Sequence, residues 1–308
     1  MLARFVSTAT KVSYSRHARS CAPIISNPWA FIRRSSTPPH VSWFSSTSDV
    51  RDPIIEMERL QNALLERAPE MATHLSEKGY YTTTDFLPQR IIETMRMQSI
   101  DLRHEGRFEQ SWSEKIDAGT GTAIRFDKEG VFACEPDGKD YDTAPDLVVY
   151  MSVLLQTLPH ALNESGGPTA GMDLSASSFN AKLAVTSPGG SVYPLHIDNP
   201  QGLSAGDTRK LTCILYLNPE HKPQDGGELR IFLGAHDNII DFSPVGGRLL
   251  LFWSDEIPHE VLPTAPLANS NDEHLDRYAL TVWIPTENIT TIHNEASKFS
   301  HLRDIAFP

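Results

Sequence analysis

The sequence predicts a mainly β protein with flanking helices, in which N-terminal supporting α-helices pack on a jelly-roll core of two sheets. Two observations predict this fold. From about residue 179 onward, short β-rich segments alternate with turn signals such as Gly189-Gly190, Gly226-Gly227 and Gly246-Gly247, a spacing typical of a sandwich or jelly roll. Before residue 163, apolar residues recur at helical spacing in three segments, which indicates helices with one buried face.

The first 48 residues differ in composition from the rest of the chain. Residues 1–48 contain five Arg, one Lys and many Ser, but no acidic residue and no long apolar run. This composition is typical of an organellar transit peptide rather than a secretory signal. We therefore expect residues 1–48 to be a disordered mitochondrial transit peptide. A plastid address and a basic tail on a cytoplasmic protein are the alternatives.

The remainder of the chain is strongly acidic. The whole chain of 308 residues carries a formal charge of −12, and because residues 1–48 contribute +6, residues 49–308 carry −18. So acidic a body does not attract nucleic acid or an anionic membrane surface, and no apolar run is long enough to span a membrane. The three Cys residues are too widely spaced to indicate a disulfide framework or a zinc site.

Helices are expected in the first half of the body. Asp52-Pro53 offers an N-cap with a first-turn proline, and Gly79 offers a stop, so the first helix lies between them. A short strand at Tyr80–Thr84 follows, and two further helices are expected at Pro88–Leu102 and Asp146–Leu162. The first helix forms an N-terminal extension, residues 49–78, to the domain that begins at residue 79.

The segment at 117–143 lies between the second and third helices and is rich in Gly, Asp and Thr. A short β-like island at Val131–Cys134 interrupts it. This composition predicts a loop or a hairpin, which could act as a lid.

The second half of the chain is expected to be built from strands. Short β-rich runs bounded by turn residues predict them at Asn180–Thr186, Tyr193–Ile197, Leu211–Leu217, Glu228–Leu233, Asn238–Phe242, Arg248–Phe252, Glu260–Leu262 and Tyr278–Ile284. The domain that they complete is expected to span residues 79–290, with a C-terminal tail at 291–308.

A His-x-Asp pair offers the start of a metal site. His196 and Asp198 lie two residues apart, and alternate side chains of an extended strand point the same way. His259 is available as a third ligand. Two His and one carboxylate on one face of the metal are the ligands of non-haem Fe(II) oxygenases. A chain with 12 His can match H-x-D by chance, so a surface turn with a His–Asp hydrogen bond is the alternative.

A second pair of residues indicates a carboxylate site. Arg277 opens a strand 18 residues after His259, and Tyr216 lies on a neighbouring strand. A buried guanidinium with a nearby phenol forms a fork for a carboxylate. Beside a ferrous ion, such a fork fits 2-oxoglutarate. A surface Arg and a core Tyr with its hydroxyl satisfied elsewhere are the alternatives.

Six segments in order resemble the prolyl 4-hydroxylase branch of the Fe(II)/2-oxoglutarate-dependent dioxygenases, and most of all the hypoxia-inducible-factor prolyl hydroxylases. They read H-I-D-N-P, K-L-T-C-I-L-Y-L-N, D-G-G-E-L-R-I-F, G-G-R-L-L-L-F-W-S-D, P-H-E-V-L-P and R-Y-A-L-T-V-W. The resemblance covers residues 193–283, with weaker similarity back to Gly79. It implies a double-stranded β-helix, the jelly roll of this family.

The resemblance also implies the roles of individual residues. The catalytic residues would be His196, Asp198 and His259 as iron ligands, with Arg277 and Tyr216 holding the distal carboxylate of 2-oxoglutarate. Four residues would line the 2-oxoglutarate pocket, and Tyr193 would lie near the iron on the substrate side; the four are Leu229, Phe252, Val261 and Trp283. A mobile hairpin covers the site in the family, and residues 118–143 hold the equivalent place.

The sequence departs from the family in three places. Close members have a Tyr ten residues before the first iron ligand, where this chain has Thr186, so contact with the end of 2-oxoglutarate nearest the iron is expected to differ. Residues 264–276 form an insertion that we expect to be a surface loop. The lid region shows little similarity, so the identity of the substrate does not transfer.

The resemblance implies an oxidoreductase that hydroxylates a prolyl residue and converts 2-oxoglutarate to succinate. Fe(II), 2-oxoglutarate and O2 would be its cofactor and cosubstrates, and ascorbate its reductant. The expected partner is a protein with an exposed proline loop. Similar bacterial enzymes modify a translation elongation factor, which makes an organellar translation protein a candidate. The alternatives are hydroxylation of another residue or a small molecule, and a non-catalytic binding module.

Overall fold

The structure is a computed structural model. It describes residues 53–116, 122–164, 169, 171–190, 192–200, 202–234, 238–266, 275–287, 289 and 298–306. The expected transit peptide therefore lies outside the described residues, as does most of the expected surface loop within residues 264–276.

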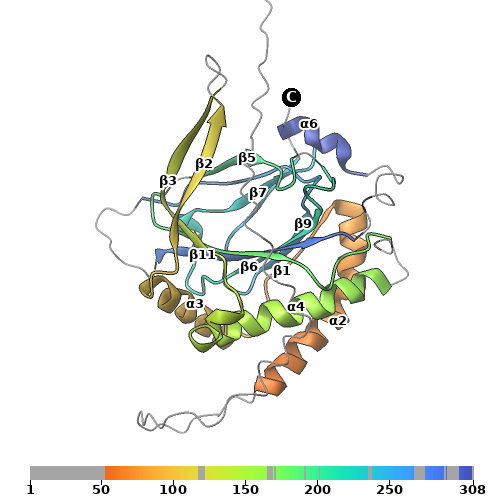
Figure 1. Cartoon of the computed structure of the whole chain (residues 1–308), viewed down its shortest axis with the longest axis horizontal. Helices are drawn as coiled ribbons and strands as arrows, with labels where there is room; N and C mark the ends of the chain where they lie inside the picture. The colour runs from red at the N-terminus through yellow and green to blue at the C-terminus, as the bar shows by residue number, and fades with distance from the viewer. Residues whose placement is uncertain are drawn as a thin grey trace, which may run out of the picture.

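Two antiparallel sheets form the core (Figure 1). The larger sheet has the strand order β1 (Tyr80–Thr83), β9 (Leu249–Trp253), β6 (Arg209–Tyr216), β11 (Arg277–Pro285), β4 (Asn180–Thr186), β3 (Ala123–Cys134) and β2 (Glu109–Ile116). The smaller sheet has the order β5 (Tyr193–His196), β10 (His259–Val261), β7 (Leu229–Phe232) and β8 (Ile239–Phe242). The prediction of a mainly β fold with two sheets is confirmed.

Three helices pack together beside the larger sheet, below it in Figure 1. They are α2 (Pro53–Lys78), α3 (Gln89–His104) and α4 (Pro145–Glu164), as predicted. The buried side of α2 includes Leu64 and Leu75, and the indole of Trp253 donates a 2.9 Å hydrogen bond to the Leu75 carbonyl. Burial of these apolar faces against the sheet, rather than helix propensity, is what stabilises the helices.

The first helix ends where the sequence predicts. Gly79 has φ +81°, and a Cβ there would lie 2.7 Å from the Ile257 side chain. Only glycine adopts this conformation in this space without strain, so the chain can turn at once into β1. Among the described residues, none of the helices combines the length and the apolar character that a bilayer crossing requires.

The predicted lid is a β-hairpin, but it begins earlier than expected. The strands β2 and β3 pair from Glu109 to Ile116, so a strand precedes the segment 117–143. Residues 138–142 form a short 3-10 helix instead of part of the hairpin. Only Val131–Cys134 of β3 pairs with β4, so the outer part of the hairpin is a two-stranded ribbon that projects from the sheet (Figure 1).

Candidate metal centre

The smaller sheet brings the two histidines together. His196 is the last residue of β5 and His259 the first of β10, and the two are direct partners across this antiparallel pair. Their ring centroids lie 4.3 Å apart. Asp198 lies just beyond the end of β5, in the turn that follows it. The strand thus ends earlier than predicted, and the turn rather than the strand aims the carboxylate at the imidazoles.

The three side chains form one cluster, called the His-Asp-His trio below. One oxygen of Asp198, Oδ1, lies 3.7 Å from His196 Nε2 and 3.8 Å from His259 Nε2, and the ligand atoms all lie within 4.8 Å of one another. Each imidazole donates its Nδ1–H to a backbone carbonyl, His196 to Pro194 at 2.8 Å and His259 to Ile257 at 3.0 Å. Because a carbonyl can only accept, these contacts select the neutral tautomer of each ring in which Nε2 carries the lone pair, as metal ligation requires.

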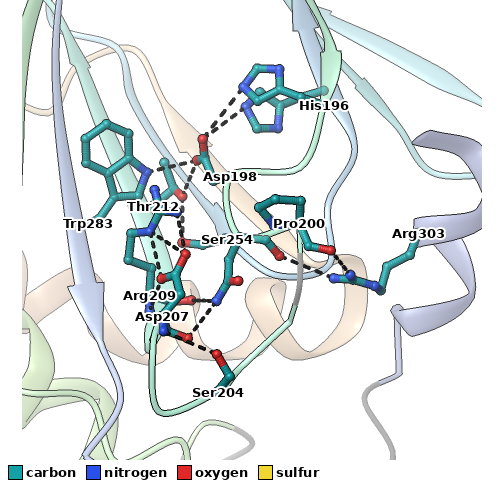
Figure 2. Close-up of polar contacts among 12 residues, drawn as sticks. His196, Asp198, Pro200, Ser204, Asp207, Arg209, Thr212, Ser254, Trp283 and Arg303 are labelled. Carbon is teal, nitrogen blue, oxygen red and sulfur yellow. Dashed lines mark hydrogen bonds and ion pairs between the residues drawn. The ribbon is translucent and has the colours of Figure 1, made fainter. Parts of the chain in front are cut away.

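The carboxylate of Asp198 is also hydrogen-bonded to neighbouring side chains (Figure 2). Its second oxygen, Oδ2, accepts hydrogen bonds from the Thr212 hydroxyl at 2.8 Å and the Trp283 indole at 3.0 Å. Thr212 is in turn 2.7 Å from the Ser254 hydroxyl. These contacts fix the carboxylate so that Oδ1 is directed toward the histidines.

The electrostatics of the trio suit a divalent cation. Burial alone would raise the pKa of Asp198, but the two histidines and the hydrogen bonds from Trp283 and Thr212 bring it below its usual value. Burial, reinforced by His259, lowers the pKa of His196 to about 4. At neutral pH His196 is therefore a neutral imidazole and Asp198 an ionised carboxylate, which are the protonation states in which these residue types bind metals.

Arg277 and Tyr216 meet on the larger sheet. Arg277 is 8% exposed, and its Nε donates a 2.8 Å hydrogen bond to the Gly227 carbonyl. The guanidinium carbon lies 5.2 Å from the centre of the Tyr216 ring. A Cβ at Gly227, which has φ +77°, would lie 2.8 Å from the Arg277 side chain, so glycine allows the backbone to approach it. The alternative of a surface arginine is excluded.

The Tyr216 hydroxyl is buried and makes no hydrogen bond within the described part of the chain. Burial raises the pKa of this phenol, although Arg277 and Arg248 oppose the shift. The Arg277 guanidinium, which donates through Nε to Gly227, also interacts with this phenol. A buried donor left without an acceptor is costly, and a ligand carboxylate would satisfy both groups.

The remaining predicted site residues lie on strands of both sheets. Leu229 and Phe252 are buried, and Val261 and Trp283 are half-buried. The Phe252 ring lies 4.7 Å from the His259 ring. Tyr193 pairs with Val261, which pairs with Leu229 across the smaller sheet, so the three share one face of it. The assignment of these residues to a 2-oxoglutarate pocket stays a prediction.

Sequence reasoning missed the support of Asp198. Trp283 was predicted only as a pocket wall, yet it donates to the carboxylate, and Thr212 and Ser254 were not predicted to have any role. A signal was present: Thr212 lies four residues before Tyr216 on the same strand, so both side chains point to the same face.

The segment expected as a C-terminal tail also contacts the turn that carries Asp198 and the residues after β9. Arg303 donates to the backbone carbonyl of Pro200 (Figure 2) and to that of Asp255. The Phe299 amide donates to the Glu256 carboxylate at 3.2 Å. The last described residues therefore pack behind the turn that carries Asp198.

Residues 181–285 match the model of the 2OG-Fe(II) oxygenase superfamily. Among curated proteins, human prolyl hydroxylase EGLN3 is 44% identical over 96 residues, which cover 30% of this chain and 35% of that protein. The hypoxia-inducible factor prolyl hydroxylase of Caenorhabditis elegans is 35% identical over 105 residues, which cover 33% of this chain and 13% of that one. The match thus spans about a third or less of the length of these relatives.

Solved structures extend the similarity beyond the matched segment. A Pseudomonas putida prolyl-4-hydroxylase aligns with a TM-score of 0.53 and 25% identity, over 72% of this chain and 100% of that one. A Trichoplax adhaerens prolyl hydroxylase, solved with a hypoxia inducible factor oxygen degradation domain peptide fragment, aligns with a TM-score of 0.53 and 25% identity, over 80% of this chain and 96% of that one. Residues 181–285 therefore form part of a domain of the 2OG-Fe(II) oxygenase superfamily, and the relatives named above are prolyl hydroxylases.

Proposed function

We propose that this chain is an Fe(II)- and 2-oxoglutarate-dependent dioxygenase that hydroxylates a prolyl residue of a protein substrate. The observation that carries the proposal is the pairing of two features in one domain. The His-Asp-His trio gathers three ligand atoms, and a buried arginine lies beside a phenol whose hydroxyl has no described partner.

The trio fits ferrous iron. His196, Asp198 and His259 would supply two imidazole nitrogens and one carboxylate oxygen, the facial set that leaves further coordination positions open. The Thr212 and Trp283 hydrogen bonds would keep Asp198 in place whether or not metal is bound. Such supporting contacts tune both ligand orientation and metal affinity.

The arginine–phenol pair fits the distal carboxylate of 2-oxoglutarate. Arg277 would bind it through its terminal nitrogens, and Tyr216 would donate its hydroxyl hydrogen. Leu229 and Phe252 are buried apolar residues that would exclude water around the carbon chain of the cosubstrate. When bound, Fe(II), 2-oxoglutarate and O2 together supply the oxidising chemistry, which yields succinate, carbon dioxide and a hydroxylated substrate.

The prolyl target rests on the relatives, which are prolyl hydroxylases by name. A protein rather than a free amino acid as substrate is supported by the Trichoplax relative, which was solved with a peptide. Ascorbate would serve as the reductant that keeps the iron ferrous. Mitochondrial location is proposed from the composition of residues 1–48 alone, and a fusion of those residues to a fluorescent protein would test it.

The function is tested by supplying purified protein with Fe(II), ascorbate, 2-oxoglutarate and proline-containing peptides in air. We expect succinate to form only when iron, 2-oxoglutarate and a suitable peptide are all present. Mass spectrometry should show the gain of one oxygen atom on proline. Candidate substrates come from comparing organellar proteins of cells with and without the enzyme. If the protein binds neither iron nor 2-oxoglutarate, the result favours the alternative of a non-catalytic binding module.

A further inference from the structure

Two lysines lie against Tyr193, close to the His-Asp-His trio. Lys128 of β3 places its Nζ 3.6 Å from the centre of the Tyr193 ring, and Lys182 of β4 places its Nζ 6.0 Å from the same point. Tyr193 begins β5, the strand that ends at His196. The lysines therefore border the candidate metal centre.

Lys182 has a defined place relative to the Arg277–Tyr216 pair. In the larger sheet, Ala279 of β11 pairs with Ala184 of β4 on one side and with Tyr216 of β6 on the other. Two residues further along β11, on the same face of the sheet, Thr281 pairs with Lys182 of β4. The following row pairs Trp283 with Asn180. Alternate residues of a strand face the same side, so Lys182 lies between the row that holds Tyr216 and the row of Trp283, which supports Asp198.

Neither ammonium group has an acidic partner in the part of the chain that the structure describes. No hydrogen bond or ion pair of Lys128 Nζ or Lys182 Nζ is formed there, although residues 49–308 carry a net charge of −18. Burial, with a smaller contribution from Lys182, lowers the pKa of Lys128 to about 8. Two cations held near each other without an anion destabilise each other.

The Tyr193 hydroxyl provides an independent observation. It is buried and has no hydrogen-bond partner among the described residues, so a donor is left unsatisfied beside two cations. The attraction between a lysine and an aromatic ring favours this packing, but it leaves the hydroxyl unsatisfied. A carboxylate bound at this point would accept a hydrogen bond from the hydroxyl and reduce the repulsion between the lysines.

We propose that Lys128, Lys182 and Tyr193 form a second carboxylate-binding site, distinct from the Arg277–Tyr216 pair. This inference rests on the proposed function and deepens it. The carboxylate has two sources: the keto-acid end of 2-oxoglutarate, nearest the metal, and an acidic side chain of the substrate near the target residue.

Binding measurements without turnover test the site. Mn(II) replaces Fe(II), and calorimetry gives the affinities of 2-oxoglutarate and of matched proline peptides that carry Glu or Gln beside the proline. The variants are K128Q, K182Q, Y193F and the charge-retaining K182R. K139Q is the control, because Lys139 is exposed on the 3-10 helix at 138–142.

We expect K128Q and K182Q each to lower the affinity for one of the two carboxylate ligands about tenfold. Y193F should lower the same affinity by less, and K182R should restore it toward the wild-type value. A loss confined to 2-oxoglutarate assigns the site to the cosubstrate, and a loss confined to the Glu peptides assigns it to the substrate. Unchanged affinities for both ligands would overturn the site. If the wild type binds no 2-oxoglutarate at all, the proposed function fails, while the Glu and Gln peptides still decide the lysine site.

Discussion

The His-Asp-His trio and the outer half of the β2–β3 hairpin differ in how far their side chains are buried and contacted by the rest of the chain. Asp198 and His259 are 9% and 4% exposed, and Thr212, Ser254 and Trp283 form a hydrogen-bond network around the Asp198 carboxylate. On the hairpin, Ile124 is 52% exposed and Phe126 47%. The carboxylate at the centre of the first region is buried and hydrogen-bonded within the chain, whereas the second region keeps apolar surface in water.

This difference indicates which region is fixed and which adapts. Buried hydrogen bonds allow one arrangement of the trio, because any other leaves a polar group unsatisfied. Exposed apolar side chains on a projecting ribbon gain free energy only when something covers them. We therefore expect substitutions near the trio to affect metal and cosubstrate, and the hairpin to govern the substrate.

The largest effect is expected from Asp198→Ala. Without the carboxylate, two neutral imidazoles remain, and they lack the negative charge that holds Fe(II). We expect turnover to fall by more than about a hundredfold, beyond the 10- to 100-fold typical of losing a supporting residue. Succinate formation measures the turnover, and plasma spectrometry measures the iron content of the purified protein. The control is Asp101→Ala, at an exposed position of α3. Full activity in Asp198→Ala would refute the ligand assignment.

The next effect concerns the cosubstrate. Arg277→Lys keeps the charge but loses the planar fork, and we expect 2-oxoglutarate to bind about 10- to 100-fold more weakly. Tyr216→Phe removes one donor and should cost about tenfold. Both variants should bind Mn(II) as the wild type does, because neither residue belongs to the trio. Calorimetry with Mn(II) and 2-oxoglutarate measures both affinities. Loss of Mn(II) binding instead would mean that the pair supports the metal.

Most of the fold was predictable from the sequence, because its strands and helices bury one face. The eight strands expected from Asn180 onward and the three helices are confirmed, with boundaries within about two residues. The strand β2 was missed for a physical reason. Its sequence E-Q-S-W-S-E-K-I belongs to a ribbon largely outside the core, so neither face needs a regular apolar pattern.

The candidate site was predictable where a motif carries its own chemistry. His196, Asp198 and His259 stand in short recognisable segments, and the structure brings them together. Thr212 could not be singled out in this way, because a threonine in a strand serves packing as often as hydrogen bonding. Lys128 and Lys182 were unpredictable for another reason: their proximity depends on how the hairpin meets β4 and β5.

A smaller effect is expected from Trp283→Phe, which keeps an aromatic ring but removes the indole donor to Asp198. The carboxylate then retains only the Thr212 hydrogen bond. We expect metal affinity to fall about tenfold, the lower end for supporting residues, with little change in stability. The control is Thr281→Val, two residues before Trp283 on the same face of β11. Competition with a coloured chelator measures the metal affinities. An unchanged affinity in Trp283→Phe would show that Thr212 alone positions Asp198.

The smallest effect is expected at the base of the hairpin. Arg107, just before β2, donates 2.6 and 2.8 Å hydrogen bonds to Asp140, which follows β3 and is 6% exposed. Burial opposes ionisation of Asp140, but hydrogen bonds from Arg107 and the Asp137 amide lower its pKa below the usual value. Because Arg107 is partly exposed, solvent screens the pair. We expect Asp140→Asn to lose about 1 kcal/mol of unfolding free energy at neutral pH.

The pH dependence of this loss has a definite sign. A carboxyl group whose pKa is lower in the folded than in the unfolded state stabilises fully above its unfolded pKa of about 4 and loses that contribution as the pH falls through the folded value. The difference between wild type and Asp140→Asn should therefore shrink in acid, as measured by urea unfolding at neutral and acidic pH. Asp101→Asn on α3 should show no such trend. A difference that grows in acid would mean that Asp140 is protonated in the folded chain, and the hairpin base would then need another anchor.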